Sequence, residues 1–589
     1  MGFIVDSNDM HTKFLTIYNQ EFTYKTNKDS IAKKKLFVDK SNIINEFNNL
    51  INKGNKKNVC ITKPRGFGKT AIGAMLVSYY SKGIDCKELF DKLKVSKGKS
   101  SDVLLNRKER KQYVEFQNKF HTLYFDFSLG VDSYDTLKEY LASINQKLKY
   151  DFEQLYPDSK LVKCYFDQIY DNLYGLYEER RELFILIIDE WDYIITNQKF
   201  SQEERDKYIS FLKYLIKDRG YIAFTYMTGI TPIANQVSRS IINCFKEYSM
   251  INDSKYFSYF GFTEQEIRNL CKNNKNITYE KLEKWYGGYK EPNGEKIFNP
   301  WSVCQALSKN EICNYWTYTG LFDDLINIVN FNINGMKDEI LELVRGGKLS
   351  QVVHIYDQRN MIEKSENDLK EELYSKMVIF GFLSYYDGKI SIPNKELLNE
   401  FILLLKQKKE LKYYYDMIEN SDDMIKATFT KNTKTMCKIL EKLPMEKVMP
   451  TDNIDHGNLK RIIDFVYFNI RINYDCEEEE TEDCIYYQKK KSETVIIVEL
   501  KVNGSAKQNH DINYYNNLKI KKGYKRNILL VEIDYQSQNK TYQCRVKEYN
   551  CDIKHLSTSK SSSESLNKRN HTIDCGMSKR LRSSDKNQK

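Results

Sequence analysis

Residues 58–70 combine an apolar run, a turn rich in glycine and proline, and the triplet Gly68-Lys69-Thr70. This order predicts a buried strand, a loop and the first turn of a helix. Backbone N–H groups at such a helix N-terminus converge on a phosphate, a lysine ammonium reaches the β and γ oxygens, and a threonine hydroxyl can ligate Mg²⁺. Lys63 stands where the strict pattern G-x-x-x-x-G-K-[ST] has its first glycine. The segment predicts a nucleotide-binding loop, with an ordinary strand–turn–helix corner as the alternative.

A second segment ends in two acids. Leu183 begins a run of six apolar residues that leads into Asp189 and Glu190. This is the pattern of a parallel strand buried on both faces, and ligands of open α/β sheets bind at the C-terminal edge of such strands. We expect Asp189 to hold Mg²⁺ through water and Glu190 to polarise the water that attacks the γ-phosphate. The alternative is a core strand that ends in a solvated turn.

The stretch from Ile222 to Gly229 is a further apolar run and predicts the neighbouring strand. Thr228, near its end, would touch the γ-phosphate or the attacking water, or would be an ordinary strand terminus. The predicted nucleotide site comprises Arg65, Gly66, Gly68, Lys69, Thr70, Asp189 and Thr228, with Thr70 and Asp189 as metal ligands.

The C-terminal third holds a second set of chemically suited residues. Two strands are predicted, Asp483–Tyr487 and Val495–Lys501. Because side chains alternate along a strand, Glu499 and Lys501 lie on the same face. If Asp483 lies on the adjacent strand, two carboxylates and one ammonium converge, as phosphodiester cleavage requires. The acids and the Leu500 carbonyl would hold Mg²⁺, and Lys501 would orient or deprotonate the attacking water.

Other interpretations of this segment stay open. Glu-x-Lys is a weak pattern because strand ends are often charged, and the acidic run at 477–480 indicates a solvated loop. The basic residues between 519 and 526 would meet phosphates or form a plain exposed loop.

Several short motifs occur in one order along the chain: Phe37-Val-Asp39-Lys40, Lys63-Pro64-Arg65-Gly66-Phe67-Gly68-Lys69-Thr70, Ile188-Asp189-Glu190-Trp191-Asp192, Thr228-Gly229-Ile230, Gly261-Phe262-Thr263-Glu264-Gln265-Glu266, Trp285-Tyr286-Gly287-Gly288-Tyr289 and Phe298-Asn299-Pro300-Trp301-Ser302. In this series the chain resembles, over roughly residues 20–535, a family of AAA-ATPase-like proteins fused to a PD-(D/E)XK nuclease-like domain. The resemblance implies ATP and Mg²⁺ as cofactors.

Details of the sequence agree with that family or depart from it. The family's phosphate loop typically reads Arg-Pro-Arg-x-Phe-Gly-Lys-Ser, so Lys63 in place of the first glycine follows the family pattern. The resemblance assigns the nuclease site to Asp483, Glu499, Lys501 and Gln508, spaced Asp-x15-Glu-x-Lys with the glutamine following. Many relatives carry a glutamate on the first helix of this domain, whereas this chain offers only Asp464.

The length of 589 residues allows several domains with proper cores. The patterns predict a polar lead-in over 1–30, an AAA-ATPase-like domain with a closing segment over 31–330, a helical, winged-helix-like region over 331–425, a nuclease-like domain over 426–552 and a disordered basic tail over 553–589. The hairpin expected at Phe380–Asn394, with its Asp-Gly turn, would contact DNA or serve as a packing module.

Charge and cysteine usage narrow the class of protein. The formal net charge is +11, and the tail from His555 holds eight Lys/Arg against three Asp/Glu, a net of +5, so the body of the chain is only mildly basic. Thirteen cysteines without a C-x-x-C pair, and no apolar segment at the start, predict an intracellular location, cytoplasmic or nuclear. No apolar run approaches the ~20 residues of a membrane helix, so no membrane partner is expected.

Taken together, the residues and the resemblance predict an α/β protein in which an AAA-like P-loop ATPase domain with a parallel sheet is joined to a restriction-endonuclease-like α/β domain. We expect it to bind and hydrolyse ATP and to cleave nucleic acid with Mg²⁺. Nucleic acid is the expected partner, and self-association into a homo-oligomer is open. Three alternatives stay open: a nucleotide-regulated binding or signalling protein with an inactive nuclease fold, a secreted effector that works inside another cell, and a mobile-element remnant.

Overall fold

The computed structural model of the chain describes residues 3–97, 107–233, 244–316, 325–326, 328–354, 365–442, 456–472, 474–478, 484–488, 494–506 and 527–549. These residues form two compact units, Met1–Met417 and Ile418–Lys589, and each unit is described by itself. The predicted tail over 553–589 lies outside the described residues.

A six-stranded sheet is the centre of the first unit, and its strands run in the order β1-β5-β6-β7-β4-β8. Every pairing in this sheet is parallel. The strands are β1 (Phe3–Ile4), β4 (Asn58–Thr62), β5 (His121–Asp126), β6 (Phe184–Asp189), β7 (Ile222–Gly229) and β8 (Lys246–Tyr248). The three strands predicted from apolar runs, β4, β6 and β7, are confirmed, and so is the parallel α/β sheet.

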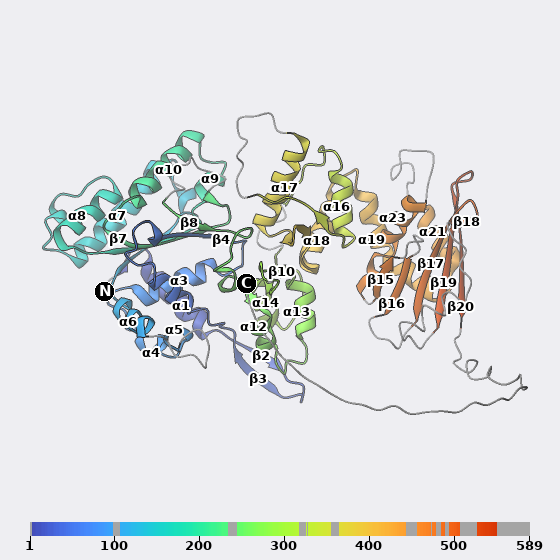
Figure 1. Cartoon of the computed structure of the whole chain (residues 1–589), viewed down its shortest axis with the longest axis horizontal. Coiled ribbons are helices and arrows are strands. Elements are labelled where there is room, and N and C mark those ends of the chain that lie inside the picture. The colour runs from blue at the N-terminus through green and yellow to red at the C-terminus, as the bar shows by residue number, and fades with distance from the viewer. Residues whose placement is uncertain are drawn as a thin grey trace, which may run out of the picture. The chain divides into compact units, whose positions relative to one another are not determined.

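Helices cover both faces of this sheet because its central strands are apolar on both faces. In β6, Phe184, Leu186 and Ile188 pack against one helical layer, and Ile185 and Ile187 pack against the other. The first layer contains α7 (Leu137–Leu155), α8 (Ile169–Arg180) and α10 (Gln202–Ile216). The second contains α1 (Ser7–Asn19), α2 (Ile43–Asn48), α3 (Lys69–Tyr80), α4 (Lys87–Phe90), α5 (Lys94–Lys97) and α6 (Arg107–Phe116). Figure 1 shows α7, α8 and α10 on one side of the strands and α1 and α3 on the other.

Within the segment 1–30, expected as a polar lead-in, residues from Phe3 onward contribute to this sheet and its helical layer. Phe3 pairs with Thr122, which makes β1 the edge strand beside β5. Phe14 of α1 is buried and stacks on Phe90 with 5.7 Å between ring centroids. The sequence pattern missed β1 because two residues are too few to show a period. The chain continues into the antiparallel hairpin of β2 (Glu21–Lys25) and β3 (Ile31–Lys35).

The rest of the first unit forms two smaller modules. The closing segment, defined here as residues 244–316, contains β9 (Phe262–Thr263), α12 (Glu264–Leu270), α13 (Tyr279–Tyr286), β10 (Tyr289–Lys290), β11 (Lys296–Phe298) and α14 (Pro300–Lys309). The hairpin module, residues 336–407, contains α16 (Met336–Val344), β12 (Leu349–Ser350), α17 (Glu366–Phe380), β13 (Ser384–Tyr386), β14 (Lys389–Ser391) and α18 (Lys395–Gln407). Helix α19 (Lys412–Glu419) follows.

The predicted hairpin with its Asp-Gly turn is confirmed. Tyr386 of β13 pairs with Lys389 of β14, and the two residues between them have positive φ, 52° at Asp387 and 70° at Gly388. A two-residue turn of this kind matches the twist of the strands, which is why Asp-Gly is a strong hairpin signal. Helix α17 ends before this hairpin and helix α18 follows it, and the winged-helix-like character of the region stays a prediction.

The second unit contains a mixed sheet in the order β15-β16-β17-β19-β20, with β18 paired to β17. Its elements are α20 (Ser421–Phe429), α21 (Thr433–Glu441), α23 (His456–Val466), β15 (Tyr474–Glu478), β16 (Cys484–Gln488), β17 (Val495–Val502), β18 (Ser505–Ala506), β19 (Ile528–Gln536) and β20 (Thr541–Tyr549). Among the described strands of this unit, only β17 and β19 pair in parallel. The two strands predicted around 483–487 and 495–501 are antiparallel neighbours, β16 and β17.

In the part of the chain that the structure describes, no helix combines the length and the apolar character that crossing a membrane demands.

Candidate functional site

The 63–70 loop joins the end of β4 to the start of α3, as predicted. Gly66 and Gly68 have φ of 79° and 88°, values that residues with a Cβ adopt only with strain. A Cβ added to Gly66 would lie 2.9 Å from both Asn299 Oδ1 and Trp301 Cβ. The backbone of the loop therefore depends on glycine at 66 for two reasons, its conformation and the close approach of the closing segment.

The ammonium of Lys69 lies inside this loop. Lys69 Nζ donates to the carbonyl oxygens of Lys63 (3.1 Å) and Pro64 (3.3 Å), and it is 3.8 Å from Glu190 Oε1. Only 4% of the Lys69 side chain is exposed, against 28% for Glu190. The structure thus brings together the lysine of one predicted motif and the acid of the other, with the acid on the more open side.

Asp189, at the end of β6, is buried and held by three donors. Tyr124 OH donates to its Oδ2 (2.9 Å), the Glu190 amide donates to its Oδ1 (3.1 Å), and Thr70 adds a side-chain hydrogen bond. Burial raises the pKa of Asp189, the neighbouring Glu190 raises it further, and the Thr70 bond opposes the rise. A carboxylate and a hydroxyl in contact are the oxygen donors that a hard cation such as Mg²⁺ accepts, so Thr70 and Asp189 fit the ligand set of such a cation.

Glu190 has a φ of 47°, in the left-handed region that non-glycine residues rarely occupy. Such a conformation persists only when neighbouring contacts hold it, and it is common at functional sites. The next residues supply those contacts. The Trp191 amide donates to Thr228 O (3.1 Å), and Tyr208 OH donates to Trp191 O (2.7 Å).

Asp192 is a residue of this site that the sequence analysis did not select. Its buried carboxylate accepts from the amides of Ile230 (3.1 Å) and Thr231 (2.6 Å) just beyond β7. Burial raises the pKa of Asp192, and the negative charge of Glu190 adds to the rise. Asp192 thus joins the segments that follow β6 and β7, close to Glu190 after β6 and Thr228 on β7.

Two predicted contacts lie at the margin of this arrangement. Thr228 is buried, and its hydroxyl donates to Ile61 O of β4 (2.7 Å), so it is engaged within the sheet. Arg65 has an exposed side chain, while its carbonyl oxygen accepts from Asn299 Nδ2 (3.4 Å). The roles of Thr228 and Arg65 toward a nucleotide stay predictions.

The closing segment and the hairpin module both contact the 63–70 loop. The Trp301 amide donates to Gly66 O (3.2 Å), and Phe67 packs edge-on against Tyr289 with centroids 5.2 Å apart. Gly381, which ends α17, approaches the loop so closely that an added Cβ would be 2.7 Å from Pro64 Cγ. The hairpin module therefore packs against this loop, in line with the packing role that the sequence left open.

The second predicted site is partly within the described residues. Glu499, Leu500 and Lys501 lie on β17, and Lys501 Nζ is 3.6 Å from Glu499 Oε2, so the two side chains share a face as predicted. Asp483 and Gln508 lie outside the described residues. Asp464 is buried on α23, which packs on β17.

Glu532 of β19 is the acid that sequence reasoning missed in this unit. It pairs in register with Glu499, and its carboxylate is 3.5 Å from Lys501 Nζ and 2.8 Å from Lys547 Nζ. Burial opposes ionisation, but Lys547 and Lys501 together lower the pKa of Glu532. Among the described residues no group of three or more His, Cys, Asp or Glu side chains that could hold a metal ion occurs. The described part of this unit thus offers two carboxylates that share one lysine.

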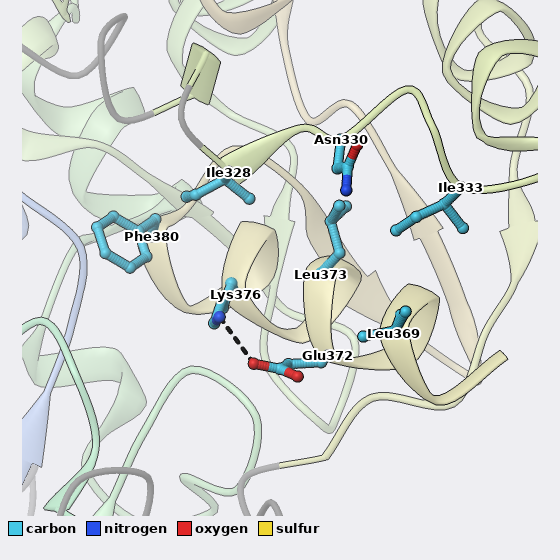
Figure 2. A pocket seen from close by; sticks show the side chains of 8 residues that line it. All are labelled: Ile328, Asn330, Ile333, Leu369, Glu372, Leu373, Lys376 and Phe380. Atoms are coloured by element: carbon cyan, nitrogen blue, oxygen red, sulfur yellow. Dashed lines mark ion pairs between the residues drawn. The ribbon is translucent and has the colours of Figure 1, made fainter. Parts of the chain in front are cut away.

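A pocket of about 330 Å³ lies along α17 (Figure 2), and its lining residues are Ile328, Asn330, Ile333, Leu369, Glu372, Leu373, Lys376 and Phe380. The ion pair between Lys376 and Glu372, with 2.8 Å between the charged atoms, stands at its edge. None of the predicted site residues lines it.

Residues 25–238 match the sequence model of a protein family described as "Predicted AAA-ATPase". The matched segment contains Lys69, Thr70, Asp189, Glu190 and Thr228, and it agrees with the first half of the resemblance seen in the sequence. The match ends before the second unit and does not bear on it. A search of curated proteins found no similar sequence.

Two solved structures are similar to this chain. The Walker-type ATPase PABY2304 of Pyrococcus abyssi is 10% identical, with a TM-score of 0.28 over 65% of this chain and 99% of that chain. The ORC2 protein of Aeropyrum pernix, described as ADPNP–ADP complexes, is 11% identical, with a TM-score of 0.28 over 59% of this chain and 88% of that chain. At this TM-score neither likeness supports a conclusion about this chain.

Proposed function

We propose that the first unit binds ATP together with Mg²⁺ and hydrolyses it. The observation that carries the proposal is the convergence of Lys69, Thr70, Asp189 and Glu190 at the C-terminal edge of a parallel sheet. Ligands of open α/β sheets bind at this edge, and the N-terminus of α3 adds backbone donors for phosphate. The match of residues 25–238 to an AAA-ATPase family model supports the same function.

Each residue has a separate task in this proposal. Lys69 supplies the positive charge for the β- and γ-phosphates, in place of its contacts with the Lys63 and Pro64 carbonyls. Thr70 and Asp189 would hold Mg²⁺, which neutralises phosphate charge when it is bound. Glu190, the more exposed acid, accepts the proton of the attacking water.

The first test is Lys69→Ala, which we expect to weaken ATP binding while the protein stays folded. A hydrogen bond to a charged group contributes roughly 1.5–3 kcal/mol, which corresponds to about a 10- to 150-fold loss of affinity. Isothermal titration of ATP with Mg²⁺ measures the change. Lys82→Ala is the matched control, because Lys82 follows the opposite end of α3 and pairs with Glu182. Unchanged ATP affinity in Lys69→Ala would exclude this loop as the nucleotide site.

We propose, as a second activity, metal-dependent cleavage of a nucleic acid by the second unit. The observation that favours it is the pair of carboxylates, Glu499 and Glu532, on the parallel strands β17 and β19 with Lys501 between them. Two carboxylates suit a divalent cation, and the lysine would orient or deprotonate the attacking water. An inactive scaffold, in which Lys501 only neutralises the two acids, is the alternative that the same ion pairs allow.

Cleavage assays on single- and double-stranded DNA and RNA, with Mg²⁺ or Mn²⁺ and with or without ATP, separate these two cases. We expect Glu499→Gln to weaken Mn²⁺ binding and to abolish cleavage. We expect Lys501→Met to slow cleavage by roughly 10²- to 10⁴-fold and to leave the metal bound, because lysine is no metal ligand. Lys431→Met, which removes an exposed ion pair with Glu548, is the control. No cleavage by the parent protein with either metal would assign this unit to the inactive-scaffold class.

A further inference from the structure

Lys63 occupies the place of the first glycine of the loop pattern, yet its side chain is fully buried. Its Nζ is 2.8 Å from Asp253 Oδ2, and both side chains are 0% exposed. Nζ also donates to Ser249 O (3.3 Å) and lies 4.4 Å from the centroid of the Phe257 ring. These partners belong to the segment that follows β8, so Lys63 reaches away from the 63–70 loop toward the closing segment.

The backbone of Lys63 is fixed at the same time. Its amide donates to Gly229 O at the end of β7 (3.1 Å), and its carbonyl oxygen accepts from Lys69 Nζ (3.1 Å). Asp253, in turn, accepts through Oδ1 from the amides of Lys255 (2.9 Å) and Tyr256 (2.6 Å). Lys63 is therefore held through its amide by the end of β7 and through its side chain by Asp253, which lies outside the loop.

We propose that Lys63 is a positioning residue of the ATP site, which holds the 63–70 loop in its binding shape through the buried ion pair with Asp253. This inference rests on the proposed ATP-binding function. It adds to the site Lys63, which stands where the strict loop pattern has glycine. The physical reason is that a buried charge without its partner is costly, whereas a complete buried pair defines one geometry. Burial lowers the pKa of Lys63, and Asp253 opposes that shift, as expected for such a pair.

A second lysine, with 11% of its side chain exposed, contacts the same region. Lys40 Nζ lies 2.6 Å from Glu266 Oε2 and donates to Ser258 O (2.6 Å). Glu291 of the closing segment interacts electrostatically with both Lys63 and Lys40. Lys63 and Lys40 thus both form ion pairs with residues of the closing segment. These contacts support a positioning role for that part of the unit.

The decisive variant is Lys63→Gly, which restores the strict pattern G-x-x-x-x-G-K-T. If Lys63 only replaced the glycine of the pattern and had no role of its own, the Lys63→Gly protein would bind ATP as tightly as the parent or more tightly. We expect the opposite, a loss on the order of 10²-fold in ATP affinity or hydrolysis, because a small displacement of positioned groups has effects of this size. Lys63→Arg keeps a positive charge that reaches Asp253 and should retain most of the activity. If only the size of the Lys63 side chain mattered, the larger arginine would not be expected to do so.

A measurement without nucleotide separates this inference from the ATP proposal. Amide hydrogen–deuterium exchange of the peptide covering 63–70 should be faster in Lys63→Met than in the parent. It should also be faster in Asp253→Asn, although Asp253 lies outside the loop. The double variant should exchange no faster than either single variant, because residues in one ion pair act non-additively. Lys57→Met is the matched control, since Lys57 precedes the other end of β4 and donates to Arg219 O and Ile222 O.

The outcomes are distinct. Loop exchange equal to the parent in both Lys63→Met and Asp253→Asn overturns the positioning role, and so does a Lys63→Gly protein that binds ATP at least as tightly as the parent. A parent that binds no ATP overturns the proposed function, while the exchange experiment still decides the role of Lys63. If Lys63→Gly fails to fold, Asp253→Asn and Lys63→Arg provide the same comparison.

Discussion

Glu190→Gln is expected to leave ATP binding intact and to slow ATP hydrolysis by roughly 10²- to 10⁴-fold, the usual contribution of a general base. The amide keeps the size of the side chain but cannot accept the proton of the attacking water. Binding should persist because the Glu190 carboxylate lies 3.8 Å from Lys69 Nζ, and Lys69 remains available for phosphate. Titration of ATP together with a phosphate-release assay on the same preparation measures both quantities.

A matched variant at the other end of the same strand controls for this change. Glu182 precedes β6, where Glu190 follows it, and it interacts with Lys82 and His121. Glu182→Gln removes a carboxylate of similar exposure, 22% against 28%, far from the proposed site. We expect it to hydrolyse ATP like the parent. Parental hydrolysis in Glu190→Gln would show that another group activates the water.

The second large effect is expected from Gly229→Ala at the end of β7. A Cβ at this position would lie 2.3 Å from Asp192 Oδ1 and 2.6 Å from Trp191 Cδ1, closer than real contacts allow. The Asp192 carboxylate would have to leave its bonds with the Ile230 and Thr231 amides. Overpacking and the disrupted buried hydrogen bonds together should lower the free energy of unfolding by about 3 kcal/mol. Hydrolysis should fall as well, because Asp192 and Trp191 follow Glu190 directly.

Gly220→Ala is the control for this prediction. Gly220 precedes the other end of β7, and the atom nearest to a Cβ there would be Tyr177 OH at 3.6 Å, an ordinary contact. Thermal unfolding followed by circular dichroism should show a lower transition temperature for Gly229→Ala alone. Equal transition temperatures for the two variants would mean that the Asp192 contacts adjust without cost and would contradict the prediction.

Local sequence patterns were sufficient to predict the features that depend only on neighbouring residues. Six apolar residues before Asp189 define a strand buried on both faces, and the structure confirms β6 with its acid at the C-terminal edge. The Asp387-Gly388 turn is decided by two residues that accept positive φ. Glu499 and Lys501 share a face because side chains alternate with period two in any strand.

The partners of these residues could not be predicted, because they come from distant parts of the chain. Asp253 pairs with Lys63 because the tertiary fold brings the segment after β8 to the end of β4. Asn299 lies against Gly66 because the closing segment packs on the 63–70 loop. Glu532 faces Glu499 through the register of two parallel strands, which no local pattern encodes.

The sequence by itself therefore determined which residues are suited to bind phosphate and on which strands they stand, since burial and alternation act over a few neighbouring residues. Only the tertiary structure decided how those residues are held. It placed Lys69 against Glu190, gave Lys63 a buried partner in Asp253, and added Asp192 and Glu532 to the two candidate sites. The physical reason is that a buried charge requires a compensating partner, and long-range packing alone selects which residue provides it.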